Sequence, residues 1–400
     1  MKRRSALCLF LSAVILLAGC WDKKELSDIA FVMGLGINLT ENGMYEVYFQ
    51  IVNPGKISGR QKGSSGSGSA VTVYTEKGET LFEAIRKASK VVPRRLTFSH
   101  TAMLVIGERL AKSGRLATIF DFTNRYYKFR STTLVFIAMQ GSGKTPLAIV
   151  NPLEQIPAVK VSETMEKTDE LWGTNIKLNI NGVTQALASK SRGLTISGLT
   201  VTGNVKKGQM LSGSPSTGSA AVVKIGGLAI FRKGKLIGWV KREDARGINW
   251  VRDKIDKTVV NIPCTKNKAA MAVEVLRTYT KVTPVLKKDM PQMKISILAE
   301  GNLQEAPCPI DLTKPEAIKE LNRKFAAKVK KEVLGAVNTA QKMKTDVFGF
   351  GEAINRANPR VWKGLEKNWN ETFSKMEVKV NVQFMIRRMG LRTKPLTKIK

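Results

Sequence analysis

The sequence predicts a multi-domain protein of mixed α+β and α/β class, with a C-terminal antiparallel sheet packed on a long helix. Three observations support this prediction. Short apolar runs alternate with helical patterns in the first half, an apolar stripe marks one long helix after residue 313, and a regularly alternating strand closes the chain. A chain of 400 residues is also longer than one ordinary hydrophobic core supports.

The first 20 residues, MKRRSALCLFLSAVILLAGC, predict a lipoprotein signal. A basic start precedes an apolar stretch that is too short to remain as a membrane-spanning helix. Leu17-Ala18-Gly19-Cys20 matches the bacterial lipobox, so residues 1–19 would be removed by cleavage after Gly19, and Cys20 would carry an S-diacylglycerol and an N-acyl group. Such acyl chains form a stable anchor. The alternatives are an ordinary signal peptide with an incidental cysteine and a helical anchor that is never cleaved.

Residues 20–150 are predicted to form an N-terminal α/β domain. Two alternating runs, 29–37 and 44–52, form a strand pair around Glu41-Asn42-Gly43. The remaining elements follow in order: a helix within 78–92, a buried strand at 101–107, an amphipathic helix at 114–129 and a second buried strand at 131–139.

A small middle domain, residues 151–212, is predicted from a helical or loop-like stretch at 153–190 and a strand at 194–205. Segments rich in glycine and serine, at 58–69 and 209–220, have nothing to bury and are predicted to be flexible. The second segment marks the boundary to a C-terminal α+β domain, residues 220–400.

The C-terminal domain combines a hairpin at 221–240, long strands at 270–282 and 292–299, and one long helix. Thr313 and Glu316 match a capping box for this helix. The helix is expected to lie against the protein's own sheet rather than against a partner. Its apolar stripe consists of Ile318, Leu321, Phe325, Val329, Val333, Ala336, Ala340 and Met343. The closing strand alternates through Met376, Val378, Val380, Val382, Phe384 and Ile386.

The charge is strongly positive. The chain has 66 basic and 32 acidic residues, a net charge of +34, which becomes +31 once the three basic residues of the signal are removed. Because the basic residues are spread along the chain, two interpretations stay open: a solvated surface and a basic patch that faces anionic lipid headgroups. Binding to DNA would rest on charge alone, because the sequence contains no recognition motif.

No catalytic, cofactor or metal site is predicted. The single histidine, His100, excludes paired-histidine chemistry and is expected to be a structural, hydrogen-bonded residue. The run GSGKT at 141–145 resembles a phosphate-binding loop, but Ala138 stands where the first glycine is required and Pro146 disrupts the helix start. A strand-to-helix turn is therefore expected, with Lys144 as a candidate contact for anionic headgroups.

Two cysteines remain for the folded part, Cys264 and Cys308, 44 residues apart. Outside the cytoplasm they could form a disulfide, and their spacing fits no metal site. The alternative is that they stay free thiols, because two cysteines without metal-like spacing often form no bond.

Several sequence blocks follow one another in order along nearly the whole chain after the lipobox. In the first half they are CWDKKEL, VMGLGI, QIVNPG, GETLFEAIRK and FSHTAMLVIGE. In the second half they are GLAIFRKGKLIGWVKREDARGINW, DVFGFGEAINRANPRVWK and EVKVNVQFMIRRMG. The blocks resemble those of the Ger(x)C lipoproteins, the C subunits of spore germinant receptors. The loop at 58–69 and the high charge depart from the family's pattern.

The resemblance implies three α/β domains, no enzymatic activity and no cofactor. It also implies that Cys20 anchors the protein on the outer face of the spore inner membrane, where it would assemble with integral-membrane A-type and B-type receptor subunits. Such a complex senses small nutrient germinants and triggers germination, and we expect a role in assembly and signal coupling. The alternative is a solute-binding lipoprotein that delivers a small ligand to a membrane transporter, although the sequence has no internal duplication.

Three regions are candidate partner contacts: the segments at 58–69 and 209–220, and a surface carrying Trp239, Arg242 and Trp250. The alternative for the two tryptophans is a place in the core, because they adjoin predicted strands.

Overall fold

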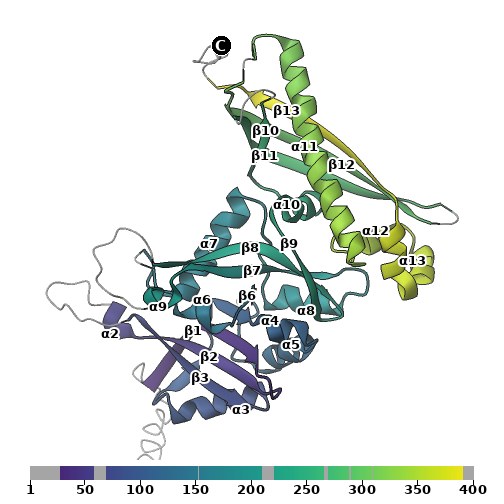
Figure 1. The fold of residues 1–400 in the computed structure, drawn as a ribbon. Coiled ribbons are helices and arrows are strands. Elements are labelled where there is room, and N and C mark those ends of the chain that lie inside the picture. The colour runs from purple at the N-terminus through teal and green to yellow at the C-terminus, as the bar shows by residue number, and fades with distance from the viewer. Residues whose placement is uncertain are drawn as a thin grey trace, which may run out of the picture.

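The computed structural model describes residues 28–57, 69–151, 153–209, 220–264, 269–287, 290–308 and 310–390. Two β-sheets form two units, which are stacked one above the other in Figure 1, with the N-terminal unit below. The expected signal peptide, Cys20 and most of both glycine- and serine-rich segments lie outside the described residues.

The N-terminal sheet has the strand order β3-β2-β1-β5-β6-β7-β8-β9, with β4 beside β1. Its strands are β1 (Ile29–Leu39), β2 (Tyr45–Val52), β3 (Val71–Gly78), β4 (Arg95–Thr97), β5 (Met103–Ile106), β6 (Leu134–Ala138), β7 (Leu194–Gly203), β8 (Ala221–Arg232) and β9 (Lys235–Val240). The central strands β1, β5, β6 and β7 are parallel, and both flanks are antiparallel. The predicted strand pair, buried strands and hairpin are confirmed.

Helices cover both faces of this sheet. One face carries α3 (Leu81–Lys87), α4 (Glu108–Lys112), α5 (Leu116–Arg125) and α8 (Ile180–Ala188), and the other carries α6 (Lys144–Ala148) and α7 (Pro157–Leu171). Short helices α2 (Pro54–Ile57) and α9 (Val205–Gly208) complete the unit. Because both faces are covered, every residue of β5 and β6 is buried, as is usual for central parallel strands.

The hydrogen bonds of this one sheet cross the expected domain boundaries. β7 comes from the expected middle domain, and β8 and β9 come from the expected C-terminal domain, yet all three extend the N-terminal sheet. The boundaries at 150, 212 and 220 therefore stay predictions, and none of them coincides with an edge of the sheet.

The C-terminal sheet has the order β10-β11-β12-β13, with strands β10 (Thr258–Pro263), β11 (Ala270–Val285), β12 (Gln292–Glu305) and β13 (Val378–Arg388). The first three strands are antiparallel, as predicted, whereas β13 runs parallel to β12. The reason is that a helical crossover connects β12 to β13 and returns the chain to the end where β12 begins. The crossover consists of α11 (Pro315–Lys342), α12 (Phe350–Ala357), α13 (Pro359–Leu365) and α14 (Trp369–Lys375).

The long helix α11 lies along one face of this sheet (Figure 1). The predicted stripe is confirmed: its six central residues are buried, and Ile318 and Met343 are partly buried against the same core. The predicted capping box is wrong. Lys314 occupies the N-cap without a side-chain hydrogen bond, and the Thr313 hydroxyl donates instead to Asp311 Oδ1 at 2.6 Å. The local aspartate turn therefore takes the hydroxyl that the box required.

Candidate functional site

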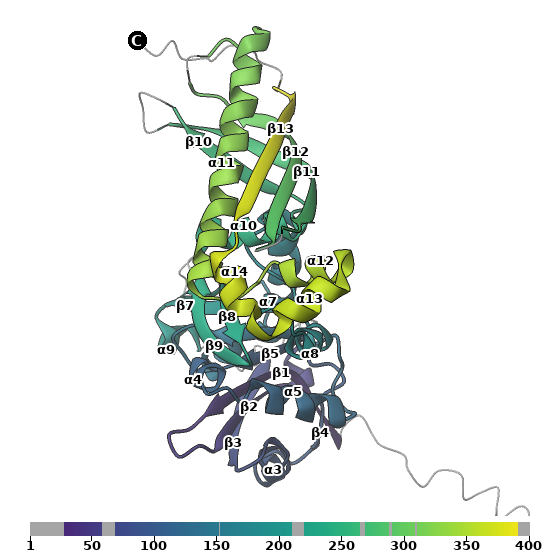
Figure 2. The ribbon, with the colours of Figure 1, turned by 90° about the vertical axis from the view of Figure 1, so that its right-hand side faces the viewer.

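The two units meet at α10 (Arg242–Val251), which directly follows β9. Figure 2 shows α10 between the two sheets. Leu228 and Ile230 of β8 and Val240 of β9 belong to the same buried core as α10, α11 and the C-terminal strands. The edge of the N-terminal sheet and the C-terminal sheet therefore share one core, and two of the three C-terminal motif blocks lie at this junction.

A buried ion pair joins α10 to α11. Arg246 Nε donates to Glu332 Oε2 at 2.8 Å and Nη2 donates to Oε1 at 2.5 Å. The two side chains are 7% and 0% exposed. The remaining guanidinium nitrogen, Nη1, donates to the Val259 carbonyl at 2.8 Å. Each charge is buried and depends on the other, because a buried charge without its partner is strongly unfavourable.

Trp250 and Gly247 contact the same glutamate. The fully buried Trp250 donates from Nε1 to Glu332 Oε2 at 3.1 Å. A Cβ atom at Gly247 would lie 2.3 Å from the Glu332 carbonyl oxygen, so only glycine permits this approach of the two helices. Three residues of the block GWVKREDARGINW therefore contact Glu332 of α11: Arg246, Gly247 and Trp250.

Glu332 is a key position that the sequence patterns did not reveal. It follows Val329 by three residues and precedes Ala336 by four, which places it beside the apolar stripe of α11. A charged residue in such a stripe is the signal that could have identified it, because a buried carboxylate requires a buried partner.

The block DVFGFG forms a loop that is organised by Asp346. Oδ1 accepts from the amides of Phe348 and Gly349 at 3.0 and 2.9 Å, and Oδ2 accepts from the Gly351 amide at 2.9 Å. Burial raises the pKa of this carboxyl to about 6, although the amide hydrogen bonds favour the charged form. Gly349 has a φ of 84°, a left-handed conformation in which glycine carries no steric penalty.

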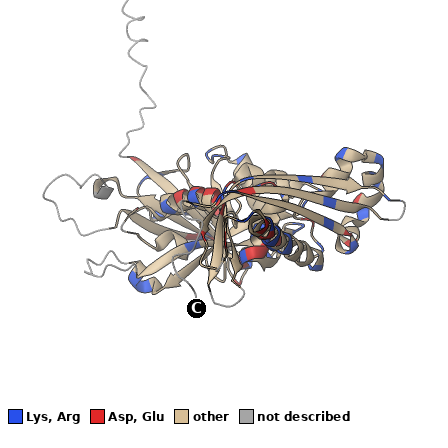
Figure 3. Ribbon diagram, turned by 90° about the horizontal axis from the view of Figure 1, so that it is seen from above, with Lys and Arg blue, Asp and Glu red and all other residues tan. Residues whose placement is uncertain are grey.

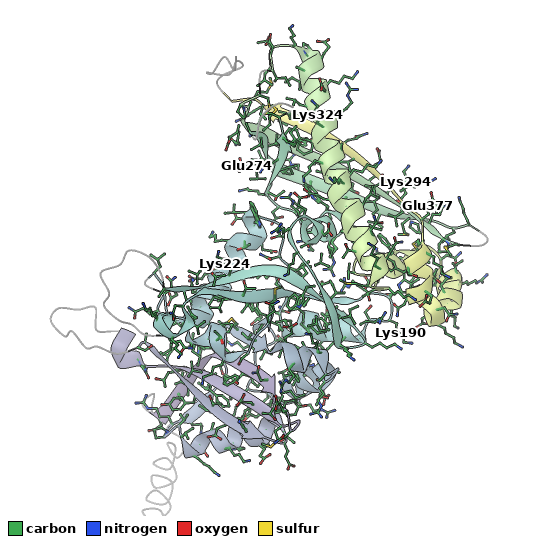
Figure 4. The ribbon with its side chains drawn as sticks, viewed as in Figure 1. Lys190, Lys224, Glu274, Lys294, Lys324 and Glu377 are labelled. Atoms are coloured by element: carbon green, nitrogen blue, oxygen red, sulfur yellow. A yellow bond between two sulfur atoms is a disulfide. The ribbon has the colours of Figure 1, made fainter. Side chains whose placement is uncertain are left out.

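The same loop binds the N-terminal unit. The Gly193 amide donates to the Asp346 carbonyl at 2.7 Å, and a Cβ atom at Gly193 would lie 2.3 Å from Thr345 Cγ2. Nearby, Lys190 Nζ lies 3.0 Å from Glu366 Oε1. Figure 4 shows Lys190 at the edge of the N-terminal unit that faces the C-terminal helices. Main-chain and side-chain contacts thus tie the two units together.

The three residues of the predicted contact surface do not form one surface. Trp250 lies in the core, so its prediction as a partner contact is wrong and the core alternative is confirmed. Trp239 is half-buried, and its Nε1 donates to Glu108 Oε1 of the N-terminal unit at 3.4 Å. Arg242 is exposed at the start of α10. The segments 58–68 and 210–219 lie outside the described residues.

The GSGKT run is a strand-to-helix turn, as predicted. The Gly143 amide donates to Asn38 Oδ1 at 3.0 Å, and Asn38 Nδ2 donates to Ser142 Oγ at 2.9 Å. An amide that a phosphate would need is therefore already bonded to β1. Lys144 is exposed, with Nζ 5.9 Å from the centroid of the Tyr48 ring. Its contact with lipid headgroups stays a prediction.

His100 is exposed, and its ring packs edge-on against Phe31 with centroids 5.4 Å apart. The expected hydrogen-bonded role is thus replaced by an aromatic contact.

In the part of the chain that the structure describes, no three His, Cys, Asp or Glu side chains are placed to hold a metal ion. Over the same ranges, no helix is both long and apolar enough to cross a bilayer.

Cys264 and Cys308 form a disulfide, with Cα atoms 5.6 Å apart. Cys264 follows β10 and Cys308 follows β12, so the bond joins the ends of these strands around the β11–β12 hairpin. The question that the sequence left open is thereby answered in favour of the bridge.

Two family descriptions match this architecture. "Spore germination protein N-terminal domain" matches residues 22–201, and "Spore germination B3/GerAC like, C-terminal" matches residues 226–390. The C-terminal match contains the residues of the Arg246–Glu332 pair and the Asp346 loop. These matches define the class of the chain as a two-part spore germination protein.

Individual proteins of known family are similar to this chain over most of its length. Spore germination protein KC of Bacillus subtilis (strain 168) is 33% identical over 391 residues, which cover 97% of this chain and 96% of that protein. Spore germination protein B3 of the same strain is 23% identical and covers 98% of this chain and 99% of that protein. The crystal structure of the GerBC protein has a TM-score of 0.55 at 18% identity, covering 92% of this chain and 100% of that chain, and shows the shared fold. The chain belongs to the Ger(x)C family of spore germination proteins.

Proposed function

We propose that the chain is a non-enzymatic, lipid-anchored subunit of a nutrient germinant receptor that triggers spore germination. The observation that carries this proposal is the 33% identity to spore germination protein KC over 97% of the chain. We expect its task to be assembly and signal coupling within that receptor.

In this proposal Cys20 carries the S-diacylglycerol and N-acyl groups and holds the protein on the outer, non-cytoplasmic face of the spore inner membrane. The lipobox at residues 17–20 supports the anchor. Integral-membrane A-type and B-type receptor subunits are the proposed partners. Lys and Arg occur on elements of both units (Figure 3).

The anchor is tested with spores that carry Cys20→Ala, and Cys8→Ala within the signal serves as the matched control. We expect Cys20→Ala to remove the protein from the inner-membrane fraction and to slow germination in response to the matching nutrient, while other receptors respond normally. Spores with Cys8→Ala should behave like wild type. An unchanged membrane fraction and nutrient response in Cys20→Ala would contradict the proposal.

The partners are tested by purifying the tagged protein from detergent-solubilised spore membranes. We expect both integral-membrane subunits to co-purify with it. Recovery of the chain in good yield without either subunit would contradict complex membership and leave the anchor to be judged on its own experiment.

A further inference from the structure

A cavity of about 600 Å³ lies at the junction of the two units. Its walls come from the 169–195 stretch of the N-terminal unit, the end of α10, β11 and α12. Sites for small molecules commonly have this size and lie where domains meet. The block at 346–363 contributes to its walls Phe348, Gly349, Glu352, Ala353 and Arg356.

Two arginines in the lining, Arg192 and Arg252, have more hydrogen-bond donors than acceptors nearby. Arg192 Nε is buried without a hydrogen-bond partner, and Glu352 Oε1 lies 3.7 Å from it, beyond hydrogen-bond distance. Arg252 donates from Nη1 to Thr195 Oγ1 at 2.9 Å. The buried carboxylate of Asp346 is already used by the amides of its own loop. Buried donors normally have acceptors, so this arrangement is incomplete.

Electrostatics agree with the geometry. Burial, followed by the neighbouring charge of Arg192, lowers the pKa of Arg252 to about 10. An acceptor with negative charge between the two guanidinium groups would offset both effects. The whole lining is close to balanced, with five basic and four acidic residues. The unpaired donor of Arg192 beside the guanidinium of Arg252, and not the net charge of the cavity, favours an anionic ligand.

Asn175 lines the same cavity as the two arginines. Its side chain is 1% exposed, and neither Nδ2 nor Oδ1 has a hydrogen-bond partner among the described residues. Leaving a buried amide unpaired costs about 1–3 kcal/mol per group. The wall that carries the two arginines therefore also contains an unpaired buried amide.

The cavity lining also contains apolar side chains. Leu194, Val251 and Phe348 are buried side chains that contribute apolar surface to the cavity. We infer that the cavity binds a small organic carboxylate, whose oxygens accept from Arg192 and Arg252 while its apolar part lies against Leu194, Val251 and Phe348. A guanidinium fork matches a carboxylate in two parallel hydrogen bonds, which explains the choice of this anion. The inference rests on these contacts and not on the receptor role.

The test is calorimetric titration of the full-length protein in detergent micelles near neutral pH. Isocaproate, a branched carboxylate, should give saturable binding, whereas its uncharged analogue isocaproamide should bind about tenfold more weakly or worse. Equal affinities for the acid and the amide would overturn the inference, as would the absence of saturable binding by isocaproate. Inorganic phosphate serves as a third probe, and binding of phosphate without binding of isocaproate would overturn the assignment to a carboxylate.

Variants connect the binding to the two arginines. Arg192→Gln and Arg252→Gln should each weaken isocaproate binding by about tenfold or more, because each removes a charged donor. Arg360→Gln on the exposed surface of α13 is the matched control and should bind like wild type. Circular dichroism identifies the variants that remain folded, and the partly exposed Arg192 supplies a readout if Arg252→Gln unfolds. Wild-type affinity in a folded Arg192→Gln variant would overturn the inference.

Discussion

The two sheets are stabilised in different ways. The N-terminal sheet is covered by helices on both faces, and its central strands β5 and β6 are buried throughout. The C-terminal sheet carries α11 on one face, and its other face is open: in β12 the side chain of Leu298 is half-buried, and opposite it on β11 Tyr279 is 60% exposed. In β12, buried residues alternate with half-buried or exposed ones along most of the strand.

The difference in helix coverage is accompanied by a difference in the groups that stabilise each core. A sheet with two apolar faces is stabilised by apolar burial, whereas the C-terminal core contains the charged pair of Arg246 and Glu332. This pair orients α10 against α11, and through α10 it orients one unit on the other. The comparison predicts that loss of the charged pair is more damaging than loss of an apolar side chain, and that apolar losses matter only on covered faces.

The largest effect is expected from Glu332→Ala. It leaves the Arg246 guanidinium buried without its carboxylate, which should lower the free energy of unfolding by about 3–5 kcal/mol. Urea unfolding followed by tryptophan fluorescence measures this loss. Glu320→Ala, which breaks the exposed pair with Lys324 on the same helix, should lower the free energy of unfolding far less, because solvent screens the exposed pair. Similar losses in the two variants would refute the central role of the buried pair.

The second prediction compares the two sheets directly. Leu104→Ala in β5 empties space in a core that is closed on both faces, so we expect a loss of about 2–4 kcal/mol. Leu298→Ala on the open face of β12 should cost less than about 1 kcal/mol, because solvent already reaches this side chain. Urea unfolding measures both. Equal losses would show that the outer face of the C-terminal sheet is covered in solution.

The third prediction concerns pH at the junction. The pKa of Asp346 is raised from 3.8 to about 6 in the folded chain, so the folded state binds its proton more tightly than the unfolded state does. The stability that comes from this proton is present below about pH 4 and is lost as the pH rises toward about 6, with a total change of roughly 2–3 kcal/mol. Asp346→Asn lacks this titration. The difference in unfolding free energy between wild type and Asp346→Asn should therefore change across this window, and parallel pH profiles would contradict the assignment.

Much of the fold could be predicted from the sequence, but less of the site. The strand pair at the start, the two buried strands, the hairpin, the long helix and the closing strand are all confirmed. At the junction, sequence reasoning selected Trp239, Arg242 and Trp250 as a possible surface, whereas the residues that join the units are Arg246, Glu332 and Asp346. The signal for Glu332 was present beside its helical stripe, but its partner could not be identified because it lies 86 residues away along the chain.

The sequence by itself determined the character of each element. Periodicity of two or of three to four residues is a local property, and it distinguishes the fully apolar strands of the N-terminal sheet from the alternating β13. Only the tertiary structure decided that β8 and β9 extend the N-terminal sheet, that β13 runs parallel to β12, and that Arg192, Arg252 and Asn175 meet around one cavity. These outcomes depend on which buried surfaces and charges find each other across long stretches of chain, and no local pattern encodes that choice.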